Sequence, residues 1–280
     1  MKLDFDWRAV RKPAHAVGIA LVLLHLLIAG AAPWISPFDP VALVGGRTQP
    51  PGALFLLGTD VLGRDYLSRL LHGGRVALLV AFSGVLLSVF VGSLVGVACA
   101  YLRGALDHVV MRLVDVKLAL PGLLFIALFI TGFGESVPVL IALIGLVYMP
   151  GVIRIVRAQA LTHASLDYVR AAQLRGERTA AIIWRELYPN MLDITLVEFA
   201  IRMSSAVLLL SSMSFLGLGI SPPTPDWGLM VSEGVGQMSF APWLVLAPSL
   251  FISTLVLGLN FGSEALASAL GVDASRGNVG

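Results

Sequence analysis

The side chains best suited to chemistry are few, and their spacing forms no catalytic pattern. A P-loop needs a lysine directly after a glycine so that the ammonium reaches nucleotide phosphates, and none of the three lysines follows one: Lys2, Lys12 and Lys117. The five histidines show neither HExxH nor paired metal-ligand spacing: His15, His25, His72, His108 and His163. A single cysteine, Cys99, excludes an internal disulfide and a CxxC site. We therefore predict no catalytic residue, no cofactor and no metal.

Charged side chains near the apolar segments could in principle relay protons. Asp115 and Lys117 open one such segment, and Glu198 and Arg202 lie at the start of another. A relay needs carboxylates near the middle of the membrane, whereas these lie near segment ends. Glu198 and Arg202 have the i,i+4 spacing of an ion pair on one helix face. We interpret these charges as structural.

A polar segment, "DYVRAAQLRG", begins at Asp167 between apolar stretches. Ser165 or Asp167 can cap a short helix by accepting hydrogen bonds from the amides of its first turn. Gly176 suits the left-handed residue that closes a helix. Thr179 can cap a second helix, "AAIIWRELY", which we expect to stop before Pro189 because proline disfavours helical geometry in the preceding residue. The pattern predicts a helical hairpin at the membrane surface.

The elements that must position this hairpin are membrane spans. Of 280 residues, 57% are hydrophobic and only 13% are charged, about half the charged fraction of a soluble domain. Spans in lipid must satisfy their own backbone groups as helices or closed barrels, and the runs lack the alternation of barrel strands. We predict an all-α integral membrane protein with six transmembrane helices, from six charge-poor stretches: 14–34, 76–101, 115–133, 137–156, 194–215 and 242–263.

Lysine and arginine set the expected orientation. They are concentrated in residues 1–12 and in the loop 157–190, whereas the loop 217–241 has none. Both termini are therefore predicted to be cytoplasmic. The expected division is residues 1–12 as a cytoplasmic N-terminus, 13–37 as a retained signal-anchor helix, 38–74 outside, 75–265 as a core with five spans and the cytoplasmic loop 157–190, and 266–280 as a cytoplasmic tail.

The external segment 57–75 has helical features. Asp60 is the expected N-cap, and Asp65 with Arg69 has the favourable i,i+4 order. An apolar face is shared by Leu62, Tyr66 and Leu70. We predict a short amphipathic helix lying at the interface.

Three other patterns concern packing. "GSLVG" (92–96) is a GxxxG motif that permits close approach of two membrane helices. His25 within the first span is expected to pack or to form a hydrogen bond between helices. The proline-rich "SFLGLGISPPTPDWG" (214–228) is either a rigid outer loop, a lining for the external mouth or a docking surface for a partner.

The polar segment carries a family resemblance. "YVRAAQLRG…WRELYPN" resembles the cytoplasmic signature Glu-Ala-Ala, three residues, Gly and a later Pro of permease subunits in binding-protein-dependent ATP-binding-cassette importers. Arg170 stands in the glutamate position, whereas four residues match: Ala171, Ala172, Gly176 and Pro189. "LGTDVLGRDYLSRLLHGGR", "MRLVDVKLALPGLL" and "SFLGLGISPPTPDWGLM" are similar to the second, C-type permease of the dipeptide/oligopeptide/nickel branch. The motifs are collinear over nearly the whole chain.

The resemblance implies a type I importer permease fold with a cytoplasmic coupling helix. It also implies a second permease subunit as heterodimer partner, two ATP-binding subunits, an extracytoplasmic solute-binding protein, and a bacterial or archaeal cytoplasmic membrane. Membrane lipid is a further expected contact, and nucleic acid is not. The residues expected to couple to the ATPase are Tyr168, Val169, Arg170, Ala171, Ala172, Arg175, Gly176 and Pro189.

Three alternatives remain beside the peptide importer. Nickel or a metal chelate could be the substrate, because the same branch serves both. A stand-alone secondary transporter would need carboxylates near mid-membrane or sequence repeats. An integral membrane enzyme would need a nucleophile–base or metal pattern. Neither of the last two is supported by the residues.

Overall fold

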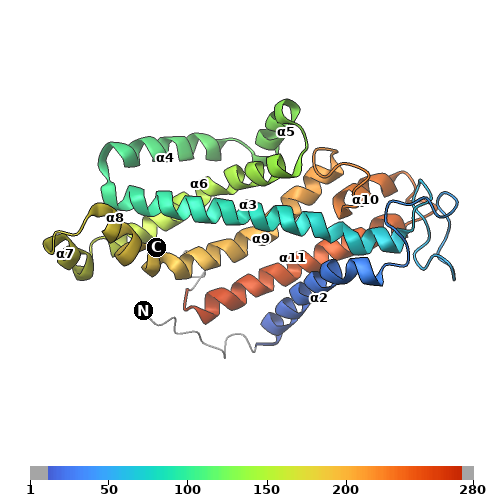
Figure 1. Cartoon of the computed structure of the whole chain (residues 1–280), viewed down its shortest axis with the longest axis horizontal. Helices are drawn as coiled ribbons and strands as arrows, with labels where there is room; N and C mark the ends of the chain where they lie inside the picture. The colour runs from blue at the N-terminus through green and yellow to red at the C-terminus, as the bar shows by residue number, and fades with distance from the viewer. Residues whose placement is uncertain (1–11, 273–280) are drawn as a thin grey trace.

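The computed structural model describes residues 12–272, which form an elongated bundle of helices (Figure 1). Within these residues, five helices are long and apolar enough to cross a membrane, and a bent pair would make a sixth crossing. The five are α2 (Pro13–Ile35), α3 (Tyr66–Leu102), α6 (Val137–His163), the continuous helix Thr179–Phe215 that contains α9 (Leu192–Phe215), and α11 (Trp243–Ala269). The described part is otherwise loops and short helices, with only isolated β-bridges. The predicted all-α membrane fold is confirmed.

The third predicted span is not one straight helix. The stretch predicted over 115–133 is divided between α4 (Gly104–Ala119) and α5 (Gly122–Phe133), which meet at 92°. Leu120 between them is extended because Pro121 follows it, and a residue before proline is pushed out of the helical region. The predicted third span is therefore a bent pair of helices rather than a single helix.

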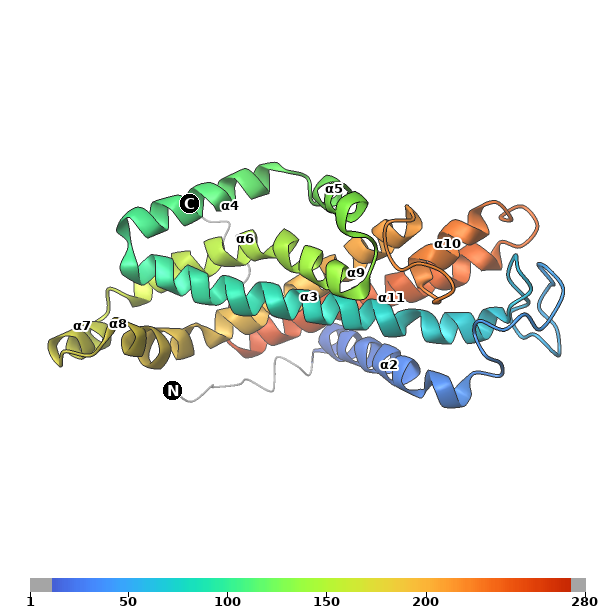
Figure 2. The ribbon, with the colours of Figure 1, turned by 45° about the horizontal axis from the view of Figure 1, so that its top comes forward.

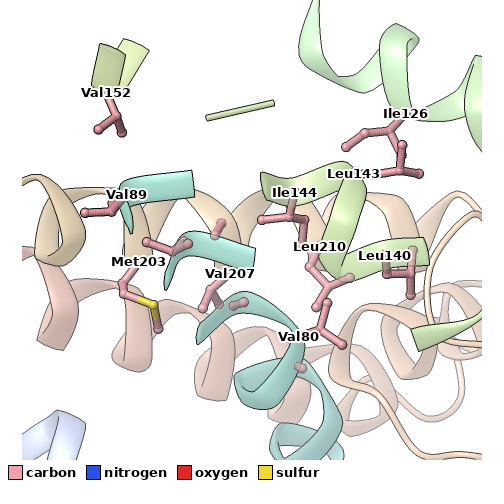
Figure 3. Packing of buried hydrophobic residues seen from close by; sticks show 14 of the residues in the cluster. Val80, Val89, Ile126, Leu140, Leu143, Ile144, Val152, Met203, Val207 and Leu210 are labelled. Carbon is pink, nitrogen blue, oxygen red and sulfur yellow. The ribbon is translucent and has the colours of Figure 1, made fainter. Parts of the chain in front are cut away.

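Glycines let α3 and α6 approach closely. A Cβ placed on Gly92 would lie 3.0 Å from the Val152 side chain, and one on Gly96 would lie 2.9 Å from the Ile153 carbonyl oxygen. The GxxxG pattern thus has the packing role predicted for it. Buried side chains from α3, α6 and α9 interdigitate along this contact, as Figure 3 shows for Val89, Ile144 and Met203, among others.

The helix that follows Thr179 does not stop before Pro189, contrary to the prediction. α8 (Thr179–Ala181) continues through one π-helical segment, η1 (Ile182–Leu187), and one 3₁₀ segment, η2 (Tyr188–Met191), into α9. Proline has no amide hydrogen and its ring crowds the carbonyl one turn earlier. Changing the winding on either side of Pro189 accommodates both effects without ending the rod.

Two groups of short segments lie at opposite ends of the bundle. α7 (Asp167–Leu174) and α8 lie at one end, and the loop 36–65 with α10 (Trp227–Val235) lies at the other, as both ribbon views agree (Figures 1 and 2). These are called the α7 end and the α10 end below. The predicted interfacial helix within 57–75 is not separate, because α3 begins at Tyr66 and continues without a break, and residues 57–65 form turns. The predicted tail lies outside the described residues beyond residue 272.

Candidate functional sites at the two ends of the bundle

α7 is a two-turn helix whose start differs from the prediction. Its N-cap is Leu166, which provides no side-chain cap. The hydroxyl of Ser165 donates instead to the Thr162 carbonyl oxygen at 2.7 Å, and Asp167 is already the first helical residue. Thr179 likewise begins α8 rather than capping it. The predicted caps were therefore wrong. Asp167 and Thr179 are each the first residue of a helix rather than the residue before it, and Ser165 bonds to a carbonyl oxygen of the preceding turn.

The end of α7 follows the prediction. Gly176 has φ of +74°, the left-handed region in which glycine carries no Cβ penalty. The next amide, that of Glu177, donates to the Ala172 carbonyl oxygen at 3.2 Å. This hydrogen bond closes the helix and turns the chain toward α8.

The faces of α7 have opposite environments. Val169 and Ala172 are completely buried against the chain's own helices. The opposite face is exposed: the side chain of Arg170 is 68% exposed, Ala171 is exposed, and Leu174 is 90% exposed. This outward face, defined here as Arg170, Ala171 and Leu174, follows the i, i+1, i+4 spacing of one helix side. The small size of Ala172 therefore serves internal packing, and Ala171 is the alanine available to a partner.

Polar contacts hold α7 against two other helices. The Gln173 side-chain amide donates to the Tyr101 hydroxyl of α3 at 3.3 Å. The Tyr168 hydroxyl lies 3.3 Å from Nδ1 of His163 in α6, and burial, helped by the charge of Glu186, raises the pKa of Tyr168. α7 is thus seated on the ends of α3 and α6 by its inner face.

The remaining predicted residues occupy different places. Arg175 bridges Glu177 at 2.7 Å and Glu186 at 3.6 Å, which ties the α7 turn to η1. Pro189 lies in η2, away from the outward face. Leu174 was missed by the sequence prediction, although its position four residues after Arg170 places it on the same helix side.

The α10 end contains a buried network of charges. Arg64 bonds through Nε to Asp60 at 2.5 Å, and Arg69, which has no exposed side-chain surface, bonds through Nη2 to Glu233 of α10 at 3.0 Å. Nε of Arg69 also lies 3.3 Å from Asp60. The predicted roles were wrong in part: Asp60 is not an N-cap, Asp65 caps α3 through the Ser68 amide, and Arg69 pairs across the fold rather than with Asp65. The network fastens α10 to the loop and to α3.

The proline-rich stretch leads into a packed corner beside this network. The Trp227 indole N–H donates to the Leu70 carbonyl oxygen at 2.8 Å, and its ring fills the space that Gly73 and Gly74 leave open. Asp226 caps α10 by accepting from the Leu229 amide at 3.0 Å. Burial raises the pKa of Asp226 to about 6. These contacts favour the rigid-loop interpretation of 214–228.

His25 joins this corner from α2. Its Nδ1 bonds to the Leu21 carbonyl oxygen at 2.8 Å, and Nε2 lies 3.3 Å from the Thr254 hydroxyl of α11. Its ring meets the edges of Trp227 and Phe251. The packing and interhelical role predicted for His25 is therefore confirmed.

A bundle of helices long and apolar enough to cross a membrane, with a short polar helix seated at one end, defines a multi-pass membrane protein. Residues 77–271 match the family described as binding-protein-dependent transport system inner membrane component. The match covers more than half of the chain, and the chain belongs to this family.

Similar proteins cover nearly the whole chain. The di/tripeptide transport system permease protein DppC of Pseudomonas aeruginosa is 36% identical over 90% of this chain and 86% of its own. The dipeptide transport system permease protein DppC of Haemophilus influenzae is 36% identical over 91% and 88%. The oligopeptide transport system permease protein OppC of the same organism is 31% identical over 95% and 87%.

Proposed function

We propose that this permease imports short peptides and receives work from a separate ATPase subunit that docks on α7. The observation that carries the proposal is the two-sided burial of α7. Its inner face is fixed by Val169 and Ala172. Among residues 12–272, the outward face of Arg170, Ala171 and Leu174 has no partner beyond a 3.9 Å contact of Arg170 with Asp167. An exposed leucine beside an arginine suits insertion into a protein groove.

The inner residues serve the same function indirectly. Tyr168, Val169 and Ala172 seat the helix, and Arg175, Gly176 and Pro189 shape the turn and the rod that follows. Movement of α7 would reach the spans through these contacts as rigid-body rocking, which gives alternating access.

The proposed wider assembly is the one that membership of this family suggests. The α7 end would face the cytoplasm with both termini, in a bacterial or archaeal cytoplasmic membrane. A second permease would complete the path, two ATP-binding subunits would occupy the cytoplasmic side, and a solute-binding protein would deliver substrate at the α10 end. The arginines of the loop 157–190 support this orientation.

Short peptides are the proposed substrate because the similar permeases are named for di/tripeptide, dipeptide and oligopeptide transport. The nickel or metal-chelate alternative has no comparable support among them. Growth on a dipeptide as sole source of a required amino acid, in cells that carry only this importer, tests the substrate class directly.

The docking role is tested by placing a charge on the outward face. In a reconstituted importer, Leu174→Asp should reduce ATPase stimulation by loaded binding protein about tenfold or more, since truncating an interface anchor costs about 2 kcal/mol. The matched control is Leu54→Asp in the α10-end loop, where the leucine is 69% exposed. Equal stimulation in Leu174→Asp and the wild-type importer would contradict the proposal.

Cross-linking gives a second, direct test. Cys99 is buried in α3, so Cys99→Ala provides a cysteine-free background for Leu174→Cys. We expect Leu174→Cys to cross-link to the ATPase subunit and Leu54→Cys not to do so. The reverse pattern would place the ATPase at the other end of the bundle.

A further inference from the structure

A cavity of about 450 Å³ lies at the α10 end of the bundle, apart from the buried charge network. This volume is within the range of small-molecule sites, about 300–1,000 Å³. Its wall is mostly apolar, with Val76 and Leu79 from α3, Val137 from α6 and Pro225 from the loop before α10. Two ionisable side chains, His72 and Arg75, also line it.

The cavity is continuous with an exposed stripe of α3. Beyond Arg75, along α3 toward the α7 end, four large apolar side chains on one side of the helix are each about half exposed: Leu79, Phe82, Leu86 and Phe90. Phe82 touches Phe199 of α9, and the neighbouring Leu87 touches Gly145 of α6, so these two helices border the stripe.

The two bordering helices meet nearer the α7 end. Arg202 of α9 packs on Gly151 of α6 and lies over the ring of Tyr148. The stripe is therefore bordered by α6 and α9, and the cavity lies at its α10 end.

Arg75 differs from the two arginines of the buried charge network. Arg64 and Arg69 are paired with Asp60 and Glu233, whereas no carboxylate within residues 12–272 forms an ion pair with Arg75. The acidic residues close to the lining in sequence bond elsewhere: Asp39 accepts from the Val41 amide, Glu135 from the Ser221 hydroxyl and Asp226 from the Leu229 amide. A guanidinium without an internal partner is available for an external anion.

His72 has a fixed orientation beside it. Nδ1 lies 2.9 Å from the Ser68 carbonyl oxygen, which can only accept, so Nδ1 carries the hydrogen. In the neutral ring Nε2 is then an acceptor. His72 and Arg75 are three residues apart and share one helix side. The pair therefore presents an acceptor next to a forked cationic donor.

We propose that His72 and Arg75 form a recognition site for the carboxyl-terminal end of the transported peptide. A peptide's last residue carries a carboxylate and, on the same residue, an amide N–H. Arg75 binds the carboxylate as a charge-assisted, bidentate partner, and Nε2 of His72 accepts from the N–H. The apolar wall takes the side chains. This inference rests on the proposed function as a peptide importer.

The test uses the complete importer in proteoliposomes with its wild-type binding protein, so that any change comes from the permease. Arg75→Gln should lower the dipeptide transported per ATP hydrolysed about tenfold, the effect of losing one charged hydrogen bond. ATPase stimulation by loaded binding protein should remain. Arg75→Lys should recover part of the transport, and His72→Phe should lose less than Arg75→Gln. The matched control is Arg47→Gln, in the exposed loop at the same end, which should transport as the wild-type chain does.

Unchanged transport in Arg75→Gln would overturn the inference. A wild-type importer without peptide uptake, or with ATPase activity insensitive to Leu174→Asp, would instead overturn the proposed function, so the failures are distinguishable. If Arg75→Gln does not assemble, Thr224→Cys gives a second measurement in the Cys99→Ala background, because Thr224 lines the same cavity and its replacement leaves Arg75 and His72 in place. Transported dipeptide should slow its modification by a thiol reagent, and no protection would count against the site.

A lipid phosphate is the competing source of an anion. Transport is therefore compared in phosphatidylcholine alone and in a mixture with phosphatidylglycerol. Peptide recognition predicts the same Arg75→Gln defect in both. A defect present only with phosphatidylglycerol would assign Arg75 to a lipid headgroup and overturn the peptide site.

Discussion

The two ends of this bundle use charge in opposite ways. At the α10 end, Arg64, Arg69 and Asp60 are almost fully buried, and their bonds join α3 and its preceding loop to Glu233, 164 residues beyond Arg69. At the α7 end, Arg170 and Asp167 are mostly exposed and 3.9 Å apart on one turn of helix. Exposed pairs contribute about 0–1 kcal/mol, whereas breaking a buried one costs about 3–5 kcal/mol.

The difference shows that contacts within the chain hold the α10 end in place, whereas part of the α7 end makes no such contacts. The α10 end is a braced structure whose parts hold one another in place. The α7 end leaves its outward face for another molecule, with only its inner face committed to the fold. Changes in the buried charge network of the α10 end should therefore appear as loss of stability, and changes on the outward face of α7 as loss of coupling.

The largest effect is expected from Asp60→Ala. It leaves two buried arginines short of a carboxylate and removes an acceptor for the Leu62 and Arg64 amides. We expect the free energy of unfolding to fall by about 3–5 kcal/mol, measured by thermal or denaturant unfolding in detergent. The control is Asp39→Ala in the same loop, whose exposed carboxylate accepts a hydrogen bond from the Val41 amide and, within the described part of the chain, forms no ion pair. Equal effects of the two variants would show that the network does not brace this end.

A pH-dependent effect follows from Asp226. Burial raises its pKa to about 6 from 3.8, so the folded chain holds this proton more tightly than the unfolded chain does. The resulting stability is complete below about pH 3.8 and is lost as pH rises through about 6. Asp226→Asn keeps a capping oxygen and does not titrate.

The stability of Asp226→Asn relative to the wild-type chain should therefore rise by about 3 kcal/mol between pH 4 and pH 8, since one pKa unit corresponds to about 1.4 kcal/mol. Melting curves of both proteins across this range measure the difference. A difference that does not vary with pH would mean that Asp226 titrates normally.

Ala171 and Ala172 allow the outward and inner faces of α7 to be compared on a single helix. Ala172→Leu forces extra volume into a filled site and should cost about 1–3 kcal/mol. Ala171→Leu faces outward and should leave the melting temperature unchanged while reducing ATPase stimulation. Melting in detergent and ATPase assays on the assembled importer separate the two. A stability loss from Ala171→Leu and none from Ala172→Leu would reverse the assignment of faces.

The smallest effect on stability is expected from Arg170→Ala, because this side chain projects outward. Its melting temperature should stay within about 2 °C of the wild-type value, as for surface changes that alter no buried contact. Coupling should nevertheless weaken several-fold. Arg178→Ala, another exposed arginine close by in the chain but off α7, is the control. Equal losses of coupling in both would indicate a diffuse electrostatic role.

Much of the fold could be predicted from the sequence, because lipid imposes simple rules. Long uncharged runs predicted the spans, and "GSLVG" predicted close approach to a neighbouring helix, although not that the neighbour is α6. The break at Leu120 was also predictable, since Pro121 lies in the middle of the third run. The prediction instead followed the overall hydropathy of residues 115–133 and did not take the effect of Pro121 into account.

The candidate sites were predictable only in part. Gly176 was identified from its backbone requirement, but which alanine faces inward depends on how a two-turn helix is seated on Tyr101 and His163. The pairing of Arg69 with Glu233 joins residues far apart in sequence, while the local pattern favoured Asp65. Local spacing cannot rank a neighbour against a distant partner that tertiary packing brings within 3.0 Å.

Because the helix continues through Pro189, Thr179–Phe215 can act as a single lever arm. Thr179–Phe215 has 37 residues, which at about 1.5 Å per residue is a rod of roughly 55 Å. Arg202, packed on Gly151 of α6, lies near its middle and is placed where a fulcrum would be. A stiff rod that pivots there moves its two ends in opposite directions, so a push beside α7 becomes a counter-movement beside α10.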